Sequence, residues 1–227
     1  MALTFCLTTD APESAAAPCI VVGVFEDHTL TTAAARVDEK SGGAIRRLLD
    51  SGDLTGKPGT AMPLFDLPGV AAPRVLVAGL GEPRKFDAAA FHRAANESAR
   101  ALKALPIDSA ISYLTDIDVP DRDNAWKLRI AALAADQQAY RYTVTFKPKE
   151  AVKTPQLRAI AFAAVSDASS ARALAQATAI AAGVRFAREL GNLPPNICNP
   201  AFIATQARHI ADSHPGVTLE VLEREDM

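Results

Sequence analysis

The fold is decided by the stretch Cys19-Ile-Val-Val-Gly-Val-Phe25, a short apolar run rich in β-branched residues. Pro18 precedes it and Glu26 follows, so its length is that of a strand. A run that is apolar at successive positions predicts a strand buried on both faces. Two further stretches have the same character and are predicted as strands: Arg74–Gly79 and Leu157–Val165.

Three weaker signals add to the expected sheet. Ser109–Leu114 is a fainter version of the buried strands. Thr60–Phe65 and Tyr142–Phe146 alternate more between apolar and polar residues, which is typical of strands with one solvated face. We therefore expect these two at the edges of the sheet.

Helical patterns lie between the strands. Asp87 is a good N-cap for a helix that Pro106 stops, Asn124–Tyr140 predicts a second helix, and Thr31–Leu49 predicts a third, loosened by Gly42-Gly43. Strands that alternate with helices predict the α/β class, with a mixed sheet flanked by helices over residues 1–166. The expected apolar faces are Phe91, Ala95, Ser98, Leu102 and Leu105 in the first helix, and Trp126, Ile130, Leu133 and Ala134 in the second.

A long Ala-rich helix is expected next, over Asp167–Leu190. Ser166 or Asp167 would cap its start, and Gly191 sits where a C′ glycine belongs. Because it separates two compositionally different stretches, residues 167–191 are interpreted as a linker helix between domains.

The remaining residues, 192–227, begin with a Pro- and Asn-rich loop. A short helix over Ala201–Asp212 and a strand over Val217–Leu222 are predicted after it. One helix and one strand cannot bury a core of their own. We therefore expect this part to be the truncated start of a second α/β domain.

The composition is that of an ordinary globular protein, with 227 residues, 49% of them hydrophobic and 22% charged. A net charge of −2 gives no general attraction to nucleic acid or anionic membranes. The three unpaired-looking cysteines, Cys6, Cys19 and Cys198, argue for a reducing compartment. No secretory leader and no membrane-length apolar run are visible, so a cytoplasmic protein without membrane contact is expected.

The main local charge imbalance is a basic strip from Arg141 to Arg158, in which Glu150 is the only acidic residue. The ordinary meaning of such a strip is a solvated surface, and contact with DNA is the alternative. The strip consists of Arg141, Lys147, Lys149, Lys153 and Arg158.

The candidate for phosphate binding is Val75-Leu-Val-Ala-Gly-Leu-Gly81, a strand that runs into Gly-x-Gly. Dinucleotide folds use such glycines to bring backbone amides close to a pyrophosphate at the start of a helix. Here the third glycine is missing, Glu82 would repel a phosphate, and the next helix starts only near Asp87. A plain turn at the end of a strand is the favoured interpretation.

The sequence predicts no catalytic residue and no metal ligand. The histidines form no His-x-His or His-Glu-x-x-His pattern, and there is no Gly-x-Ser-x-Gly elbow. A carboxylate-rich loop around Pro120 lacks the glycine and the glutamate of a calcium loop, and is interpreted as a solvated turn followed by a helix N-terminus. The residues concerned are His28, His92, His209 and His214, and Asp116, Asp118, Asp121 and Asp123.

One segment resembles the domain junction of the leucyl (cytosol) aminopeptidase family. It reads Ala181-Ala-Gly-Val-Arg-Phe-Ala-Arg-Glu-Leu190, then Gly191-Asn-Leu-Pro-Pro-Asn-Ile-Cys-Asn-Pro200. In that family a long helix joins the two domains, and an Asn-x-Pro-Pro-Asn loop opens the catalytic domain. Upstream stretches are similar to bacterial members in the same order, so the resemblance covers essentially the whole chain: Cys19–Phe25, Gly56–Gly59 and Arg122–Trp126.

The resemblance implies a two-metal exopeptidase that removes N-terminal amino acids, often leucine, from peptides with manganese or zinc. It implies a homohexamer and a non-catalytic, macro-domain-like N-terminal domain. The family's metal-binding motifs, such as Asn-Thr-Asp-Ala-Glu-Gly-Arg, have no match here. No catalytic or metal-binding residue is therefore transferred, and this chain alone is expected to bind no metal and to be inactive.

Four residues match the family loop: Asn192, Pro194, Pro195 and Asn196. Their implied role is structural, because they fix the path of the chain into the second domain. Two functions from other classes rank below the aminopeptidase reading. One is a DNA-binding module that uses the basic strip, and the other is a nucleotide-binding α/β domain that uses Gly79 and Gly81.

Overall fold

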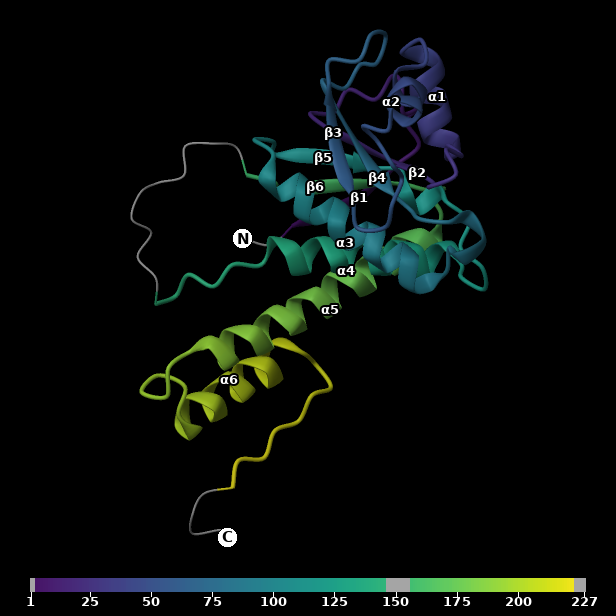
Figure 1. Ribbon diagram of the computed structural model, residues 1–227. Coiled ribbons are helices and arrows are strands. Elements are labelled where there is room, and N and C mark those ends of the chain that lie inside the picture. Colours follow the sequence, from purple (N-terminus) through teal and green to yellow (C-terminus); the bar gives the residue numbers. More distant parts are fainter. Residues whose placement is uncertain (1–2, 146–155, 223–227) are drawn as a thin grey trace. The chain divides into compact units, whose positions relative to one another are not determined.

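The computed structural model describes residues 3–145 and 156–222 (Figure 1). Within these residues the chain divides into two compact units. The larger one comprises residues 3–141 and 156–183, and the smaller one residues 142–145 and 184–222. Every buried hydrophobic residue of the described chain belongs to the larger unit. The smaller unit therefore has no core of its own among these residues.

The larger unit is built on one sheet, in which the described strands follow the order β1-β6-β5-β2-β4-β3. Neighbouring strands run parallel, except that β3 is antiparallel to β4. The α/β class with a mixed sheet is thus confirmed, and the stretch 60–65 lies at a sheet edge as expected. The strands are β1 Thr4–Thr8, β2 Ile20–Val24, β3 Ala61–Phe65, β4 Arg74–Gly79, β5 Ser109–Ser112 and β6 Ala159–Ala163.

Strand β2 is the centre of the fold, as its apolar run predicts. It lies between β5 and β4, and all of its residues are buried. Side chains at alternate positions enter two different cores: Val21 packs into one, and Ile20 and Val22 into the other. A strand that must fill a core on each side has no place for a polar side chain, which explains the unbroken apolar run.

Helices cover both faces of the sheet (Figure 1). The face of Val21 is covered by α3 (Ala88–Ala104), α4 (Asn124–Ala139) and the first half of α5 (Ala168–Asn192). The opposite face is covered by α1 (Thr32–Lys40) and α2 (Ala44–Ser51). Short 3-10 turns, η1 (Pro83–Lys85) and η2 (Leu114–Asp116), follow strands β4 and β5.

Helix α3 begins and ends as the sequence predicts. The Asp87 carboxylate accepts a hydrogen bond from the Ala90 backbone N–H at 2.8 Å, which caps the first turn. The helix ends at Ala104, just before Pro106. The expected apolar face is buried at Phe91, Ala95, Ser98 and Leu102.

The prediction of a single helix over 31–49 is wrong. The segment forms two helices, α1 and α2, because Gly42 and Gly43 both adopt positive φ angles, 68° and 82°. Two successive left-handed residues cannot continue a right-handed helix. The carboxylate of Asp38 on α1 accepts hydrogen bonds from the first amides of α2, so the glycines form a corner rather than a loosened turn.

The buried face of α4 also differs from the expected one. Of the expected residues, Ala134 is buried, whereas Trp126, Ile130 and Leu133 are only partly buried and pack against the core. Alanines fill the centre of the interface together with a leucine, because small residues let α4 approach its neighbours closely. These residues are Leu128, Ala131, Ala132 and Ala135.

Two strand predictions need correction. Residues 142–145 form no strand, and Phe146 lies outside the described residues. An edge position is instead occupied by β1, which pairs with β6 from Thr4↔Ala159 to Thr8↔Ala163. Strand β1 was not predicted because it is short and exposes Thr4 and Cys6.

The smaller unit contains the second half of α5 and helix α6 (Pro200–Ser213). The predicted short helix is thus confirmed, but Gly191 does not end the preceding one, because α5 continues through it to Asn192. The predicted strand over 217–222 is wrong, since these residues form neither strand nor helix. A strand needs a neighbour to satisfy its backbone groups, and no described strand lies in this unit.

We expect the buried thiol of Cys19 to make stability fall at alkaline pH. Burial raises the pKa of this thiol from 9.0 to about 11. Between these values the folded state keeps a proton that the unfolded state releases, so the free energy of unfolding falls as pH rises, by roughly 2–3 kcal/mol in total. Urea titrations across this range should show a flatter pH dependence in Cys19→Ala than in the wild type. Identical slopes would contradict the assignment.

Candidate functional site

The glycine turn after β4 has no amide left for a phosphate. Gly79 N–H donates to Thr60 O at 2.9 Å, Leu80 N–H to Val24 O at 2.9 Å, and Gly81 N–H to Gly56 O at 2.8 Å. All three amides are therefore engaged within the protein, whereas phosphate-binding turns direct free amides at the ligand. The interpretation as a turn at the end of a strand is confirmed.

The acidic loop before α4 is a solvated turn, as predicted. All of its aspartates are exposed, and Asp123 caps α4 by accepting the Trp126 N–H at 2.7 Å. The Arg122 guanidinium lies over the Trp126 ring, 5.3 Å from its centroid. These contacts position the start of a helix and need no metal ion.

Next to this loop lies a buried lysine that the sequence did not reveal. Lys127 is 5% exposed, and its Nζ donates a hydrogen bond to Ile117 O at 2.8 Å. Burial lowers the pKa of this ammonium group, and the nearby carboxylates of Asp118 and Asp116 oppose that effect. Lys127 thus fastens the loop to α4. The sequence does not indicate this burial, because a lysine next to an acidic loop is ordinarily expected at the surface.

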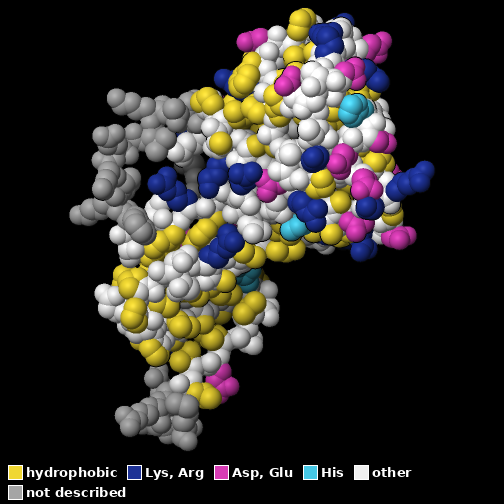
Figure 2. Space-filling model, viewed as in Figure 1, with side chains coloured by type: hydrophobic (Ala, Val, Ile, Leu, Met, Phe, Trp, Pro, Cys, Tyr) yellow, Lys and Arg dark blue, Asp and Glu magenta, His cyan; other side chains and the backbone are white. Residues whose placement is uncertain are grey.

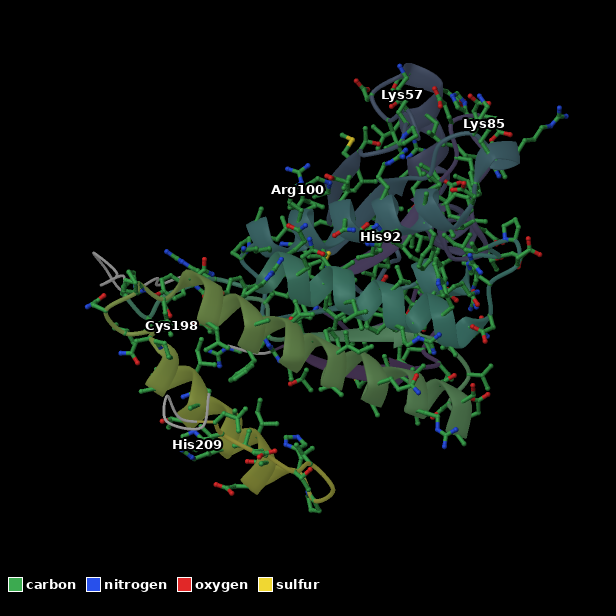
Figure 3. The ribbon with its side chains drawn as sticks, turned by 90° about the horizontal axis from the view of Figure 1, so that it is seen from below. Lys57, Lys85, His92, Arg100, Cys198 and His209 are labelled. Carbon is green, nitrogen blue, oxygen red and sulfur yellow. The ribbon has the colours of Figure 1, made fainter. Side chains whose placement is uncertain are left out.

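Within each unit, the other chemically reactive side chains of the described residues form no metal-binding cluster. In the larger unit, Figure 3 shows Lys57, Lys85 and His92 on separate elements, and in the smaller unit Cys198 lies in the turn before α6 and His209 along that helix. His28 lies 3.8 Å from Asp50 in an exposed pair. Across residues 3–145 and 156–222, no three His, Cys, Asp or Glu side chains are placed to hold a metal ion.

The predicted family loop forms a compact turn between α5 and α6. Asn192 is the last residue of α5, and the carbonyl oxygen of Pro194 accepts hydrogen bonds from the amides of Ile197 and Cys198, both at 2.9 Å. Asn199 then caps α6 by accepting the Phe202 N–H at 3.0 Å, with Pro200 in the first turn. Of the matching residues, Pro194 is half-buried, whereas Asn192, Pro195 and Asn196 are exposed.

The structure describes only part of the basic strip. Lys147, Lys149 and Lys153 lie outside the described residues. Arg158 is described, and its backbone joins the sheet by accepting the Thr4 N–H at 2.8 Å. Among the described helices, none has the length and apolar composition that spanning a membrane requires.

The smaller unit exposes much apolar surface. Figure 2 shows hydrophobic side chains gathered over the region of α5 and α6. Helix α6 has no buried residue, although it carries a periodic apolar pattern. The large exposed hydrophobic residues of this unit are Val144, Val184, Ile197, Ile203, Ile210, Val217, Leu219 and Leu222. Such a contiguous surface is typical of a region that packs against another part of a protein.

Comparison with known proteins gives a consistent answer. Residues 21–150 match the N-terminal domain of the cytosol aminopeptidase family. A relative from Xanthomonas oryzae pv. oryzae, named a probable cytosol aminopeptidase, is 48% identical over 227 residues, which are 100% of this chain and 45% of that protein. The chain therefore spans somewhat less than half the length of the curated relatives it matches.

Solved structures agree with this at the level of fold. A mutant of tomato leucine aminopeptidase aligns with a TM-score of 0.78 and 19% identity, over 99% of this chain and 45% of the tomato protein. The bottromycin maturation enzyme BotP in complex with Mn aligns with a TM-score of 0.65 and 24% identity, over 87% of this chain and 37% of BotP. At these identities the likeness concerns the fold alone.

Proposed function

This chain belongs to the cytosol aminopeptidase family, and from this premise we propose that it is the N-terminal, non-catalytic part of a leucyl aminopeptidase. The full-length protein would remove N-terminal amino acids from peptides in intracellular protein turnover. The observation that carries the proposal is the 48% identity along the whole chain to a relative of about twice its length.

Two bound divalent cations, manganese or zinc, would supply the chemistry of peptide hydrolysis by polarising the scissile carbonyl and activating a water. The described residues do not fit such a pair, because no three potential ligands converge among them. We therefore assign no catalytic step to these residues. The ligands and catalytic groups belong, in our proposal, to the part of the full-length protein that this chain does not include.

The junction loop has a structural role in this proposal. Asn192, Pro194, Pro195 and Asn196 would direct the chain from the linker helix, residues 167–191, into the catalytic domain that begins at 192. The paired hydrogen bonds to the Pro194 carbonyl and the Asn199 cap support this role, because they set the direction in which α6 leaves the turn. Residues 1–166 would form the non-catalytic domain.

The apolar surface of the smaller unit supports the same division. Helix α6 has no buried residue, yet Ile203 and Ile210 lie two turns apart on the same face of the helix and are exposed. We propose that the remainder of the catalytic domain packs on this surface. Family membership further supports a cytoplasmic homohexamer for the full-length protein.

Neither alternative function gains support. The amides of Gly79 and Gly81 are engaged within the protein, which disfavours a nucleotide site there. The proteins matched above carry the names of aminopeptidases and a maturation enzyme, and none of these names refers to DNA.

Titration with manganese tests whether the metal ions bind outside this chain, in the downstream part of the full-length protein. We expect no saturable heat when Mn²⁺ is added to the chelator-treated 227-residue chain, because its described residues offer no ligand cluster. The same chain extended through its natural downstream sequence should bind two ions per protomer. Saturable binding by the shorter chain would contradict the proposal, and binding by neither form would contradict the metal dependence.

A further inference from the structure

A small internal cavity lies between the sheet and helices α3 and α4. It is lined by residues of β2, β5, β6 and η2 and of the two helices, and every lining residue is buried. Its volume is about 20 Å³. A single water molecule needs a cavity of roughly 10–15 Å³, so one water fits and a larger molecule does not.

Two hydroxyl groups give this cavity a polar side. Ser98 on α3 and Ser112 on β5 both line it, and they are 4% and 6% exposed. The Ser98 hydroxyl makes no hydrogen bond with any described residue. Ser112 Oγ accepts only a long contact from the Leu114 N–H, at 3.5 Å, which leaves its own proton and a lone pair available.

A buried hydroxyl without a hydrogen-bond partner destabilises the folded state. A serine inside a helix usually finds a partner within the helix itself. Its Oγ can donate to the carbonyl four residues earlier, but Ser98 makes no such bond in this structure. Burying a hydroxyl without a partner disfavours the folded state, whereas a buried water with two or more polar partners offsets that cost. Alanine would pack at this position without any such cost.

We propose that this cavity is a binding site for one structural water, held between the hydroxyls of Ser98 and Ser112. The water would connect helix α3 to the central sheet through hydrogen bonds, at a place where the rest of the interface is apolar. The proposed water site lies within the larger unit and does not depend on the proposed peptidase function.

Oxygen-17 magnetic relaxation dispersion of the folded chain tests the site, because it counts long-lived waters and ignores exchanging hydroxyl protons. We expect the dispersion amplitude of Ser98→Val to fall by the contribution of one water, since valine removes a hydroxyl and fills the space. Ser41→Ala is the matched control: Ser41 is equally buried, but its hydroxyl already donates to Asp38 O at 3.1 Å. The amplitude of the control should equal that of the wild type.

Two results would overturn the proposal. One is a wild-type chain without any long-lived water, which needs no variant to interpret. The other is an unchanged amplitude in Ser98→Val, with its fold verified by circular dichroism. If Ser98→Val does not fold, Ser98→Ala replaces it. Its amplitude should also fall, because one hydroxyl in an apolar cavity does not hold a water.

Discussion

Alanine at position 79 is expected to lower the free energy of unfolding by about 3 kcal/mol or more, at the upper end of the cost of overpacking a core. Gly79 is the last residue of β4 and is buried against the loop of residues 56–60. A Cβ at this position would overlap the backbone oxygen of Lys57 and the hydroxyl of Thr60. The hydrogen bonds Gly79–Thr60 and Gly81–Gly56 hold the backbone of this loop in place, so relieving the overlap would require breaking them.

The matched control for Gly79→Ala is Gly183→Ala. Gly183 is an exposed glycine within α5, and a Cβ there would meet nothing within 4 Å. Because alanine is the better helix former, this variant should gain roughly 0.5–1 kcal/mol. Urea unfolding of both variants, followed by circular dichroism, measures the difference. A loss below about 1 kcal/mol in Gly79→Ala would show that the loop of residues 56–60 is not held as described.

Removing the Asp38 carboxylate should cost about 3 kcal/mol, because it leaves the buried backbone N–H of Ile45 and the partly buried N–H of Arg46 unpaired. Asp38 is 4% exposed and serves as the cap that α2 lacks, since the N-cap residue of α2, Gly43, has no side chain. Its oxygens accept the backbone N–H groups of Ile45 and Arg46 at 2.8 and 3.0 Å, and the Arg46 Nε at 3.1 Å.

Two variants separate the roles of Asp38. Asp38→Asn keeps an oxygen for the two amides but loses the charge, so it should lose less stability than Asp38→Ala. Glu39→Ala removes the exposed neighbouring carboxylate and should change the free energy of unfolding by no more than about 0.5 kcal/mol. Equal effects of Asp38→Ala and Glu39→Ala in thermal or urea unfolding would contradict the capping role.

The parts of the fold that the sequence predicts well are those where one physical requirement dominates. Strand β2 fills a core on each side, so its residues are apolar without interruption. Helix α3 starts at a side chain that caps it and ends before a proline that cannot continue it. In each case the requirement is local and leaves a direct trace in the residue types.

Other features depend on partners that are distant in sequence, and these the sequence could not show. Strand β1 is recognisable only through its pairing with β6, more than 150 residues away. The inward turn of Lys127 depends on the Ile117 carbonyl, and the corner at Gly43 on Asp38. Residues 217–222 show the opposite case. Their apolar alternation predicts a strand, but no neighbouring strand is present among the described residues of the smaller unit to accept and donate its backbone hydrogen bonds.

The candidate functional residues likewise fall into those that could be interpreted from the sequence and those that could not. Residue patterns were sufficient to reject a phosphate loop at Gly79 and Gly81, and the hydrogen bonds of the turn show why. The structural role that we propose for Asn192, Pro194, Pro195 and Asn196 rests on resemblance to a family. Nothing in the chemistry of an exposed Pro- and Asn-rich loop by itself indicates a peptidase.

Hydrolysis of leucine anilide in the presence of manganese tests the central claim most directly. The assay compares this 227-residue chain with the same chain extended through its natural downstream sequence, at equal protomer concentration. Our account predicts release of the anilide by the extended form alone, with activity lost on chelation and restored by Mn²⁺. Hydrolysis by the shorter chain would contradict the account, because it would place a working metal site within these residues.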